Sequence, residues 1–517
     1  MTEAQVGTTE QHETGGSSAP PAEPPRAISD RNRWVALYVL CISVLMIVLD
    51  VTVVNVALPS IKDDLGFSQS SLAWVVNAYL ITFGGLLLLA GRLGDLIGRR
   101  TILLYGLAVF VVASMLCGLS QSEAMLIGAR LLQGIGGAMT SAVVLGMIVT
   151  MFPEPREQAK AVGVYAFVAS AGGAVGLLIG GVVTQTISWH WIFFINAPIG
   201  LFTAIYAHRL LEKDKGIGFG QGADTLGAVL ITASLMLGVY TIVEPAAKDG
   251  WGAPLTLGLG AGSLILLALF IAREATTDNP LIPLRIFRSR NVTGANLVQV
   301  LTVAGMFGVF FMGSLYLQQV QGYDALQIGL AFLPVTIIMG TLTGRYSEPL
   351  IMRFGARRLL FPGLALVAAG LALFTRAPVD GNYFLYVLPV LVLLGTGVGI
   401  CFPALMTLAM SGATRADAGL ASGLVNTSAQ VGGALGLAVL ATLSTSRSDS
   451  LEAAGHSTAS ALTSGYHLAF WVAAGLVVAA IAVAATVIQP EEKAAEQFAD
   501  EESQEMPASE PAYSEAA

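Results

Sequence analysis

Charged residues are scarce in this chain: only 12% of its 517 residues are Asp, Glu, Lys or Arg, whereas 55% are hydrophobic. A soluble domain normally carries about 25% charged residues, so this chain has half of the charge that a water-exposed surface requires. This composition excludes a soluble globular protein. Lipid must be the main solvent of the chain.

Cysteine is also rare, and its pattern excludes two kinds of site. The three cysteines, Cys41, Cys117 and Cys401, lie in apolar runs, and no CxxC or Cys/His spacing occurs. Neither a disulfide framework nor a metal site is expected, and no cofactor is. The sequence contains no HExxH, GxSxG or phosphate-binding loop, which disfavours an integral-membrane enzyme. No basic stripe with interleaved aromatic residues occurs, so nucleic acid is not an expected partner.

The two ends of the chain are polar. Residues 1–33 are rich in Gly, Ser, Pro and Glu and lack the basic start of a secretory signal, and residues 489–517 are acidic and rich in Ala, Ser and Pro. These compositions predict disordered tails. The first apolar run, 34–58, is too long for a cleaved signal and predicts a retained membrane anchor.

Apolar runs long enough to cross a bilayer, about 20 residues each, occur fourteen times. They fall near 34–58, 72–91, 101–120, 124–150, 161–184, 190–211, 224–245, 253–273, 293–318, 325–344, 357–375, 383–410, 419–444 and 465–488. With both termini in the cytoplasm, 21 of the 26 Lys and Arg residues fall in inside segments and only four in outside loops. This asymmetry predicts a multi-pass membrane protein with both termini cytoplasmic. The abundance of Ala, Val, Gly and Arg indicates a GC-rich bacterial genome, so a bacterial inner membrane is the expected location.

An internal repeat is visible in the glycines. Gly163, Gly172, Gly173 and Gly176 recur with the same spacing as Gly423, Gly432, Gly433 and Gly436, and the pair Arg99–Arg100 recurs as Arg357–Arg358. Parallel repeats of this kind are a transporter architecture, with the substrate path between them. We predict an all-α fold with a six-helix bundle over 34–211, a linker with two inserted helices over 212–292, and a second six-helix bundle over 293–488.

Several motifs show a family resemblance between about residues 34 and 488. They are GRLGDLIGRR at 91–100, RLLQGIGGA at 130–138, GVYAFVASAGGAVGLLIGG at 163–181 and LDVTVVNVALPSI at 49–61. Together they resemble the major facilitator superfamily, and within it the fourteen-spanner drug:proton antiporters of the EmrB/QacA type. The resemblance implies a conformational loop at Gly91, Arg92, Asp95, Gly98, Arg99 and Arg100. It also implies an antiporter glycine motif at Gly163, Gly172, Gly176, Gly180 and Gly181.

Two positions depart from the family pattern. Gly176 is followed by Leu177 where the family usually has proline, so the fifth span is expected to lack a proline kink. The usual Trp-Arg-Trp is here Trp189-His190-Trp191. Neither departure removes the resemblance.

Asp50 and Arg130 are ionisable residues inside predicted spans. Apolar surroundings penalise an ionised carboxylate, which favours reversible protonation of Asp50, the requirement for a proton carrier. The resemblance assigns proton coupling to both residues. Alternatively they form a structural ion pair, or each faces a wet vestibule. An offset of 260 places Phe310 and Val390 at the equivalent positions, so the proton chemistry is expected in the first half.

Polar and aromatic residues within the spans are candidates for a substrate cavity. They are Asn55, Trp74, Asn77, Gln133, Asn196, Gln299, Tyr316, Asn426 and Gln430. A mostly apolar cavity with a few amides suits a small amphipathic organic substrate, although each residue could instead bond a neighbouring helix. By contrast, Asp224, Glu244 and Asp324 lie near span ends, where solvation is expected.

The predicted function is proton-coupled export of drug-like or antibiotic-like molecules by alternating access, with the substrate, protons and the lipid bilayer as partners. We expect the protein to act as a monomer. The alternatives are export of an endogenous metabolite or siderophore, or self-resistance to an antibiotic made by the same cell.

Overall fold

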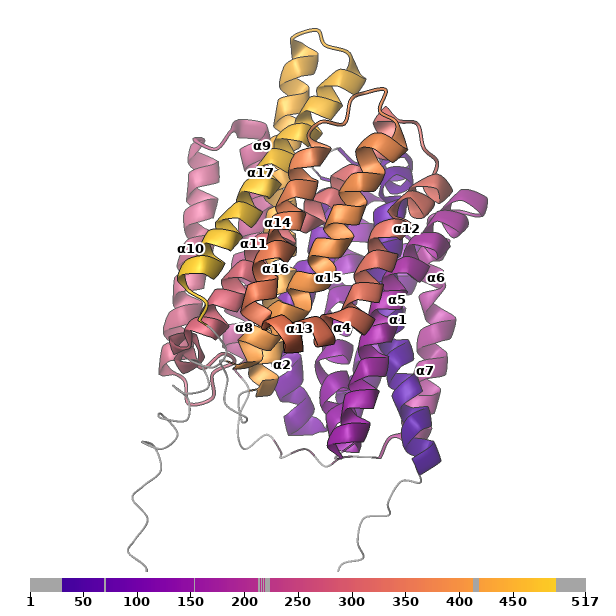
Figure 1. Ribbon diagram of the computed structural model, residues 1–517, viewed down its shortest axis with the longest axis vertical. Helices are drawn as coiled ribbons and strands as arrows, with labels where there is room; N and C mark the ends of the chain where they lie inside the picture. Colours follow the sequence, from indigo (N-terminus) through magenta and orange to yellow (C-terminus); the bar gives the residue numbers. More distant parts are fainter. Residues whose placement is uncertain are drawn as a thin grey trace, which may run out of the picture.

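A computed structural model describes residues 30–68, 71–152, 154–212, 214, 216, 218, 224–411 and 418–489. The predicted tails lie almost entirely outside the described residues. Those described form helices and connecting turns, with no β-strand among them (Figure 1). The helices are α1 (Asp30–Leu65), α2 (Ala73–Ile97), α3 (Arg99–Gly118), α4 (Glu123–Met151), α5 (Pro155–Thr186), α6 (Trp191–Phe194), α7 (Asn196–Leu210), α8 (Thr225–Val243), α9 (Pro245–Asp249), α10 (Pro254–Thr276), η2 (Leu284–Arg288), α11 (Arg290–Leu315), η3 (Tyr316–Val320), α12 (Ala325–Thr341), η4 (Leu342–Tyr346), α13 (Ser347–Phe354), α14 (Ala356–Phe374), η5 (Tyr383–Val387), α15 (Leu388–Ser411), α16 (Ala418–Ala453) and α17 (Thr458–Thr486).

Thirteen of the described helical segments are long and apolar enough to cross a membrane. The region of α5 contributes a shorter apolar segment, Val175–Thr186. The predicted span 190–211 is divided into α6 and α7, because Pro198, near the start of α7, cannot donate a backbone hydrogen bond. In contrast, α5 continues past Leu177 as one helix.

Local sequence explains where several helices begin. Ser122, Ser289 and Asp324 each accept a hydrogen bond from a backbone N–H in the first turn of the following helix. Asp324 also forms a capping box with Gln327, so its position near a span end reflects a local structural role. Glu244 pairs with Lys248 across one helical turn.

The helices before and after the inserted pair pack in corresponding ways. In the first half, α1 packs against α5 and α7, and α4 packs against α2 and α3. In the second half, α11 packs against α16 and α17, and α15 packs against α12 and α14. In Figure 1 the chain enters α1 and leaves α17 on the lower side of the bundle, whereas the ends of α16 and α17 that meet extend above it.

Two of the repeated glycines lie at corresponding close helix contacts, one in each half. A Cβ atom on Gly172 would lie 3.2 Å from Val48 Cγ1 of α1, and one on Gly432 would lie 2.6 Å from the Val300 carbonyl oxygen of α11. The repeat is therefore a repeat of packing, in which a residue without a side chain lets two backbones approach.

This packing corrects the position that corresponds to Asp50. Val48 and Val300 occupy equivalent places, so Asp50 corresponds to Thr302 and not to Phe310. Thr302 is fully buried and its hydroxyl has no hydrogen-bond partner. The second half thus has a polar side chain at this position, but one that does not titrate.

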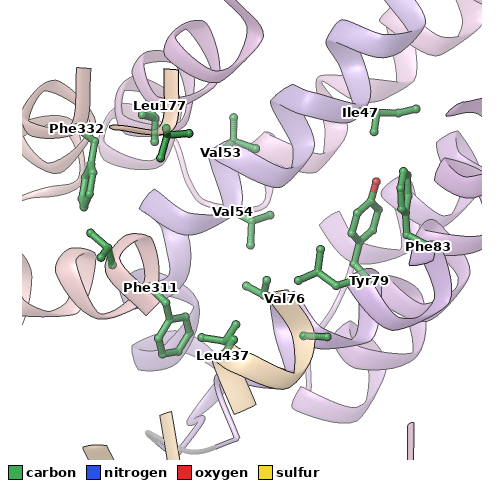
Figure 2. Close-up of a cluster of buried hydrophobic side chains, with 14 of the residues drawn as sticks. Ile47, Val53, Val54, Val76, Tyr79, Phe83, Leu177, Phe311, Phe332 and Leu437 are labelled. Carbon is green, nitrogen blue, oxygen red and sulfur yellow. The ribbon is translucent and has the colours of Figure 1, made fainter. Parts of the chain in front are cut away.

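The two halves meet along α5 and α12 and along α2 and α16. A Cβ atom on Gly181 would lie 3.0 Å from Leu326 Cα, so α5 and α12 approach closely. Buried apolar side chains from both halves belong to one cluster, in which Val54, Val76, Phe311 and Leu437 gather (Figure 2). The two halves therefore share this hydrophobic cluster.

The inserted helices α8 and α10 form a hairpin beside this interface. Ser234 donates to the Ser263 carbonyl at 2.8 Å, and Ser263 donates to the Ser234 carbonyl at 2.9 Å, which fixes the register of the pair. The α8 helix packs against α2 of the first half and α16 of the second, and Thr442 of α16 donates to the Ile242 carbonyl. The hairpin thus contacts both halves.

The expectation that Asp224 is solvated is wrong. Its side chain is buried, accepts a hydrogen bond from Gly227 N–H at the start of α8, and pairs with Arg273 of α10 at 3.2 Å. Because the two helices of the hairpin are antiparallel, the start of α8 lies beside the end of α10, which brings the two charges together.

Candidate functional site

Asp50 lies in the middle of α1 and its side chain has no exposed surface. Leu49 and Val53, its neighbours along the helix, belong to the buried core. A buried carboxylate is stable only when its oxygens receive hydrogen bonds. The residues that provide them form a buried cluster around Asp50.

Arg130 of α4 provides the first of these bonds. Its Nη1 lies 2.5 Å from Asp50 Oδ2, and its side chain is only 1% exposed. The same guanidinium donates through Nε to the Val75 carbonyl of α2 at 2.9 Å, and lies 4.5 Å from the centre of the Tyr79 ring. Arg130 is therefore held by α1, α2 and α4 and does not reach toward solvent. The wet-vestibule alternative does not fit this burial.

Two amides bind the other oxygen of Asp50. Gln133 Nε2 lies 2.6 Å from Oδ1, and Asn196 Nδ2 of α7 lies 3.0 Å from it. Gln133 also accepts from Arg130 through Oε1, at 2.7 Å, and Asn196 donates to Ser114 of α3 at 2.9 Å. We infer that Gln133 and Asn196 stabilise the Asp50 carboxylate, whereas the sequence had placed both among the candidates for a substrate cavity.

This cluster can perform one kind of chemistry. It holds one carboxyl group, one cation that keeps its charge, and two amides that bond the carboxylate. Within the part of the chain that the structure describes, no group of three or more His, Cys, Asp or Glu side chains is arranged to hold a metal ion. The arrangement suits proton binding.

Sequence analysis did not identify Ser114 or Tyr79 as members of the cluster. Ser114 is fully buried within the apolar α3, and Tyr79 is one of the largest fully buried side chains. A hydroxyl in a long apolar run was the available signal for Ser114. Nothing in the local pattern indicates that α3 turns this hydroxyl toward Asp50.

The predicted conformational loop joins α2 to α3. Arg99 donates to Asp95 Oδ1 through Nε at 3.2 Å and Nη2 at 3.0 Å, and to the Gly146 carbonyl of α4 at 3.0 Å. Gly98 has φ +109°, which favours glycine and allows two helices to meet with one residue between them. Gly91 and Arg92 lie in the last turns of α2.

A residue outside the motif completes this loop. The carboxylate of Asp214, in the segment after α7, accepts from the Arg99 backbone N–H at 2.6 Å and from the Arg100 backbone N–H at 3.2 Å. It therefore caps the start of α3 from a distant part of the chain. Arg100 in turn binds His208 of α7, through the carbonyl oxygen at 2.5 Å.

The glycine motif places α5 directly against the Asp50 region of α1. A Cβ atom on Gly176 would overlap Thr52 Oγ1, and one on Gly180 would lie 2.9 Å from Val53 Cα. Gly163 also lies in α5. With a larger residue at Gly176 or Gly180, its side chain would separate the backbone of α5 from the turn of α1 that carries Asp50.

The remaining cavity candidates lie in several environments. Asn77 of α2 is fully buried and neither its amide nitrogen nor its oxygen has a partner, and Gln299 of α11 is buried with its oxygen unpartnered. The side chain of Gln430 lies beside Gly84, where α2 meets α16. By contrast, Asn55 bonds its own helix and Tyr316 donates to the Pro378 carbonyl. Trp74 is buried and Asn426 is exposed.

Comparisons with known proteins agree with this architecture. The family model of the Major Facilitator Superfamily matches residues 40–437. The chain is 38% identical to the puromycin resistance protein pur8 of Streptomyces alboniger over 90% of this chain and 94% of that protein. It is 39% identical to the cephamycin export protein CmcT of Amycolatopsis lactamdurans, over 79% and 84% of the two chains.

Solved structures share the fold. A bacterial homologue of the human lysosomal transporter Spinster, in an inward-facing and unoccupied conformation, matches with a TM-score of 0.63 and 15% identity, over 91% of this chain and 98% of that one. The human organic anion transporter MFSD10 matches with a TM-score of 0.59 and 16% identity, over 87% and 99%. The fold is that of a multi-pass membrane transporter. The chain belongs to the major facilitator superfamily.

Proposed function

We propose that this chain is a proton-coupled antiporter that exports antibiotic-like amphipathic molecules. The observation that carries the proposal is the completely buried Asp50, which is bound to Arg130 within membrane-spanning helices. Ionisable groups inside a membrane are costly and mark proton or ion pathways. Coupling requires a group that changes its charge, and Asp50 is the carboxyl group of the cluster.

The proton cycle follows from the contacts of Asp50. In the ionised state the carboxylate draws Arg130, Gln133 and Asn196 together, and these side chains belong to α4 and α7. A proton on Asp50 removes the charge that attracts them, so the helices of the first half pack differently. We infer that a proton from outside neutralises Asp50 and changes the relative stability of outward-open and inward-open states.

The conformational loop supports the same proposal. Arg99 joins Asp95 to the Gly146 carbonyl, and both ion-pair partners are partly exposed. Contacts of this kind can break and reform when helices move. The loop would lie at the cytoplasmic face, with both termini on the same side and the chain in a bacterial inner membrane.

The substrate class is proposed from two observations. Asn77 and Gln299 are buried with unpartnered amide atoms, and Gln430 lies where the two halves meet, so polar atoms are available to a ligand among apolar side chains. The relatives that are named for resistance to puromycin and for export of cephamycin support an antibiotic-like substrate. A self-resistance pump fits the same names.

Transport by the purified chain in proteoliposomes tests the proposal. We expect export of a puromycin-like probe to be driven by a pH difference and to be lost in Asp50→Asn, which keeps the shape of the side chain but does not titrate. Asp63→Asn is the matched control, because Asp63 is an exposed carboxylate on the same helix. Transport by Asp50→Asn that still follows the pH difference, with folded protein in the membrane, would refute the role of Asp50.

A further inference from the structure

The amide of Asn196 is bonded on one side only. Its Nδ2 donates both to Asp50 Oδ1 at 3.0 Å and to Ser114 Oγ at 2.9 Å. Its Oδ1 is buried without any hydrogen-bond partner, and the side chain has no exposed surface. A buried amide oxygen without a partner is unfavourable, so this orientation persists because of what the nitrogen binds.

The partners of Nδ2 determine this orientation. An ionised Asp50 accepts hydrogen bonds and donates none. The Ser114 hydroxyl donates to the Phe193 carbonyl at 2.8 Å, so its oxygen must accept from Asn196. Both neighbours therefore require a donor from Asn196, and the amide nitrogen must face them.

A proton on Asp50 reverses this requirement. Asp50 Oδ2 faces the Arg130 cation, so the proton goes to Oδ1, which then needs an acceptor. The oxygen of Gln133 is already occupied by Arg130 at 2.7 Å and by Cys117 at 3.5 Å. The oxygen of Asn196 is the acceptor without an existing partner.

We propose that Asn196 is a positioning residue whose amide turns about its Cβ–Cγ bond when Asp50 becomes protonated, so that Oδ1 accepts the new Asp50 O–H. The proton comes from water and stays on Asp50, and no covalent bond of Asn196 breaks. This proposal rests on the proposed proton coupling and assigns its first structural response.

The turned amide changes a second contact. Its oxygen then also faces Ser114 Oγ, and two facing oxygens repel each other unless the Ser114 hydroxyl turns from the Phe193 carbonyl toward Asn196. Phe193 belongs to α6, which ends at Phe194 just before α7 begins. Protonation of Asp50 thus releases the Phe193 carbonyl close to the junction of α6 and α7, where Pro198 cannot donate a backbone hydrogen bond.

The charged and titratable groups around Asp50 are few. In the described part of the chain they are Arg130 of α4, Tyr79 of α2 and Cys117 of α3. Arg130 keeps its charge at all relevant pH values, and Tyr79 and Cys117 lie in the same buried surroundings. We therefore expect a pH-dependent change at Asn196 to report on Asp50.

Infrared difference spectroscopy of the full chain in lipid nanodiscs, recorded between acid and neutral pH, tests the proposal. With asparagine labelled at its side-chain carbonyl, the Asn196 band is the one that Asn196→Leu removes. We expect it to shift at the pH at which the Asp50 carboxyl band appears, and both changes to vanish in Asp50→Asn. Ser43→Ala is the control, because the buried Ser43 hydroxyl bonds its own helix at Leu40.

Two outcomes are distinct. An Asp50 carboxyl band that titrates while the Asn196 band stays constant would overturn this proposal and leave the proton coupling intact. The absence of any Asp50 titration would overturn the proposed function, and this proposal with it.

Transport provides a second measurement. Asn196→Leu removes one donor from the ionised carboxylate, so we expect the proton to bind about tenfold more tightly and the pH profile of export to move up by about one unit. If Asn196→Leu does not fold, turnover in Ser114→Ala takes its place, and it should fall because this variant lacks the hydroxyl that bonds the Phe193 carbonyl. An unchanged pH profile in Asn196→Leu, or an unchanged turnover in Ser114→Ala, would contradict the proposed response of Asn196 and Ser114 to the proton.

Discussion

The contact between α5 and α1 beside Asp50 gives the sharpest prediction. Gly176→Ala adds a methyl group that would overlap Thr52 Oγ1 and lie 3.0 Å from Thr52 Cβ. The Thr52 hydroxyl cannot move without cost, because it donates to the Val48 carbonyl at 2.9 Å and the Leu49 carbonyl at 3.0 Å. We therefore expect the two helices to separate slightly at the turn that carries Asp50.

Two opposing effects set the sign of the change. Alanine is favoured over glycine inside a helix by about 1 kcal/mol. Overpacking a close contact costs about 1–3 kcal/mol. We expect the overlap to prevail at Gly176, with a net destabilisation of about 1–2 kcal/mol and a loss of proton-driven export. At Gly475 of α17, where a new Cβ would have no neighbour within 4 Å, the same substitution should be neutral or slightly stabilising.

The assay is thermal unfolding of the purified protein in detergent, together with export in proteoliposomes. Thr52→Ala removes the group that the new methyl would meet, so Gly176→Ala should be tolerated in a Thr52→Ala background, with a coupling energy of about 1–2 kcal/mol. The reasoning is refuted if Gly176→Ala behaves like Gly475→Ala, or if Thr52→Ala does not relieve its effect.

Three further predictions concern the loop and the inserted hairpin. Arg99→Ala should abolish most export in the same vesicles yet lower stability by less than about 1 kcal/mol, because its ion pair is partly exposed; a large drop in melting temperature would contradict this. Gly98→Ala should destabilise by about 1 kcal/mol or more, since its φ of +109° is strained for alanine, and the measurement is the midpoint of thermal unfolding. Asp224→Ala should cost about 1–3 kcal/mol by removing a helix cap and the partner of Arg273, with little effect on the pH dependence of export; a shifted pH profile would mean that this pair takes part in coupling.

Sequence patterns alone predicted that the chain lies in a membrane, that its fold is helical, and which family it resembles. A membrane-spanning helix satisfies its backbone hydrogen bonds within itself, so a single continuous run of apolar residues in the sequence is enough to predict it. The family motifs were also visible in the sequence. Asp50 and Arg130 could be identified because each is a charged residue within a run of apolar residues.

Only the tertiary structure decided which side chains meet. Asp50 binds Arg130 across 80 residues and Asn196 across 146, and no local period records which faces of three helices converge. The pairing of Asp224 with Arg273, and the match of Asp50 with Thr302, likewise depend on how helices pack against one another. Hydrophobicity places a helix in the membrane. Its rotation about its own axis is set by the close contacts of small residues and by the hydrogen bonds that buried polar groups must find.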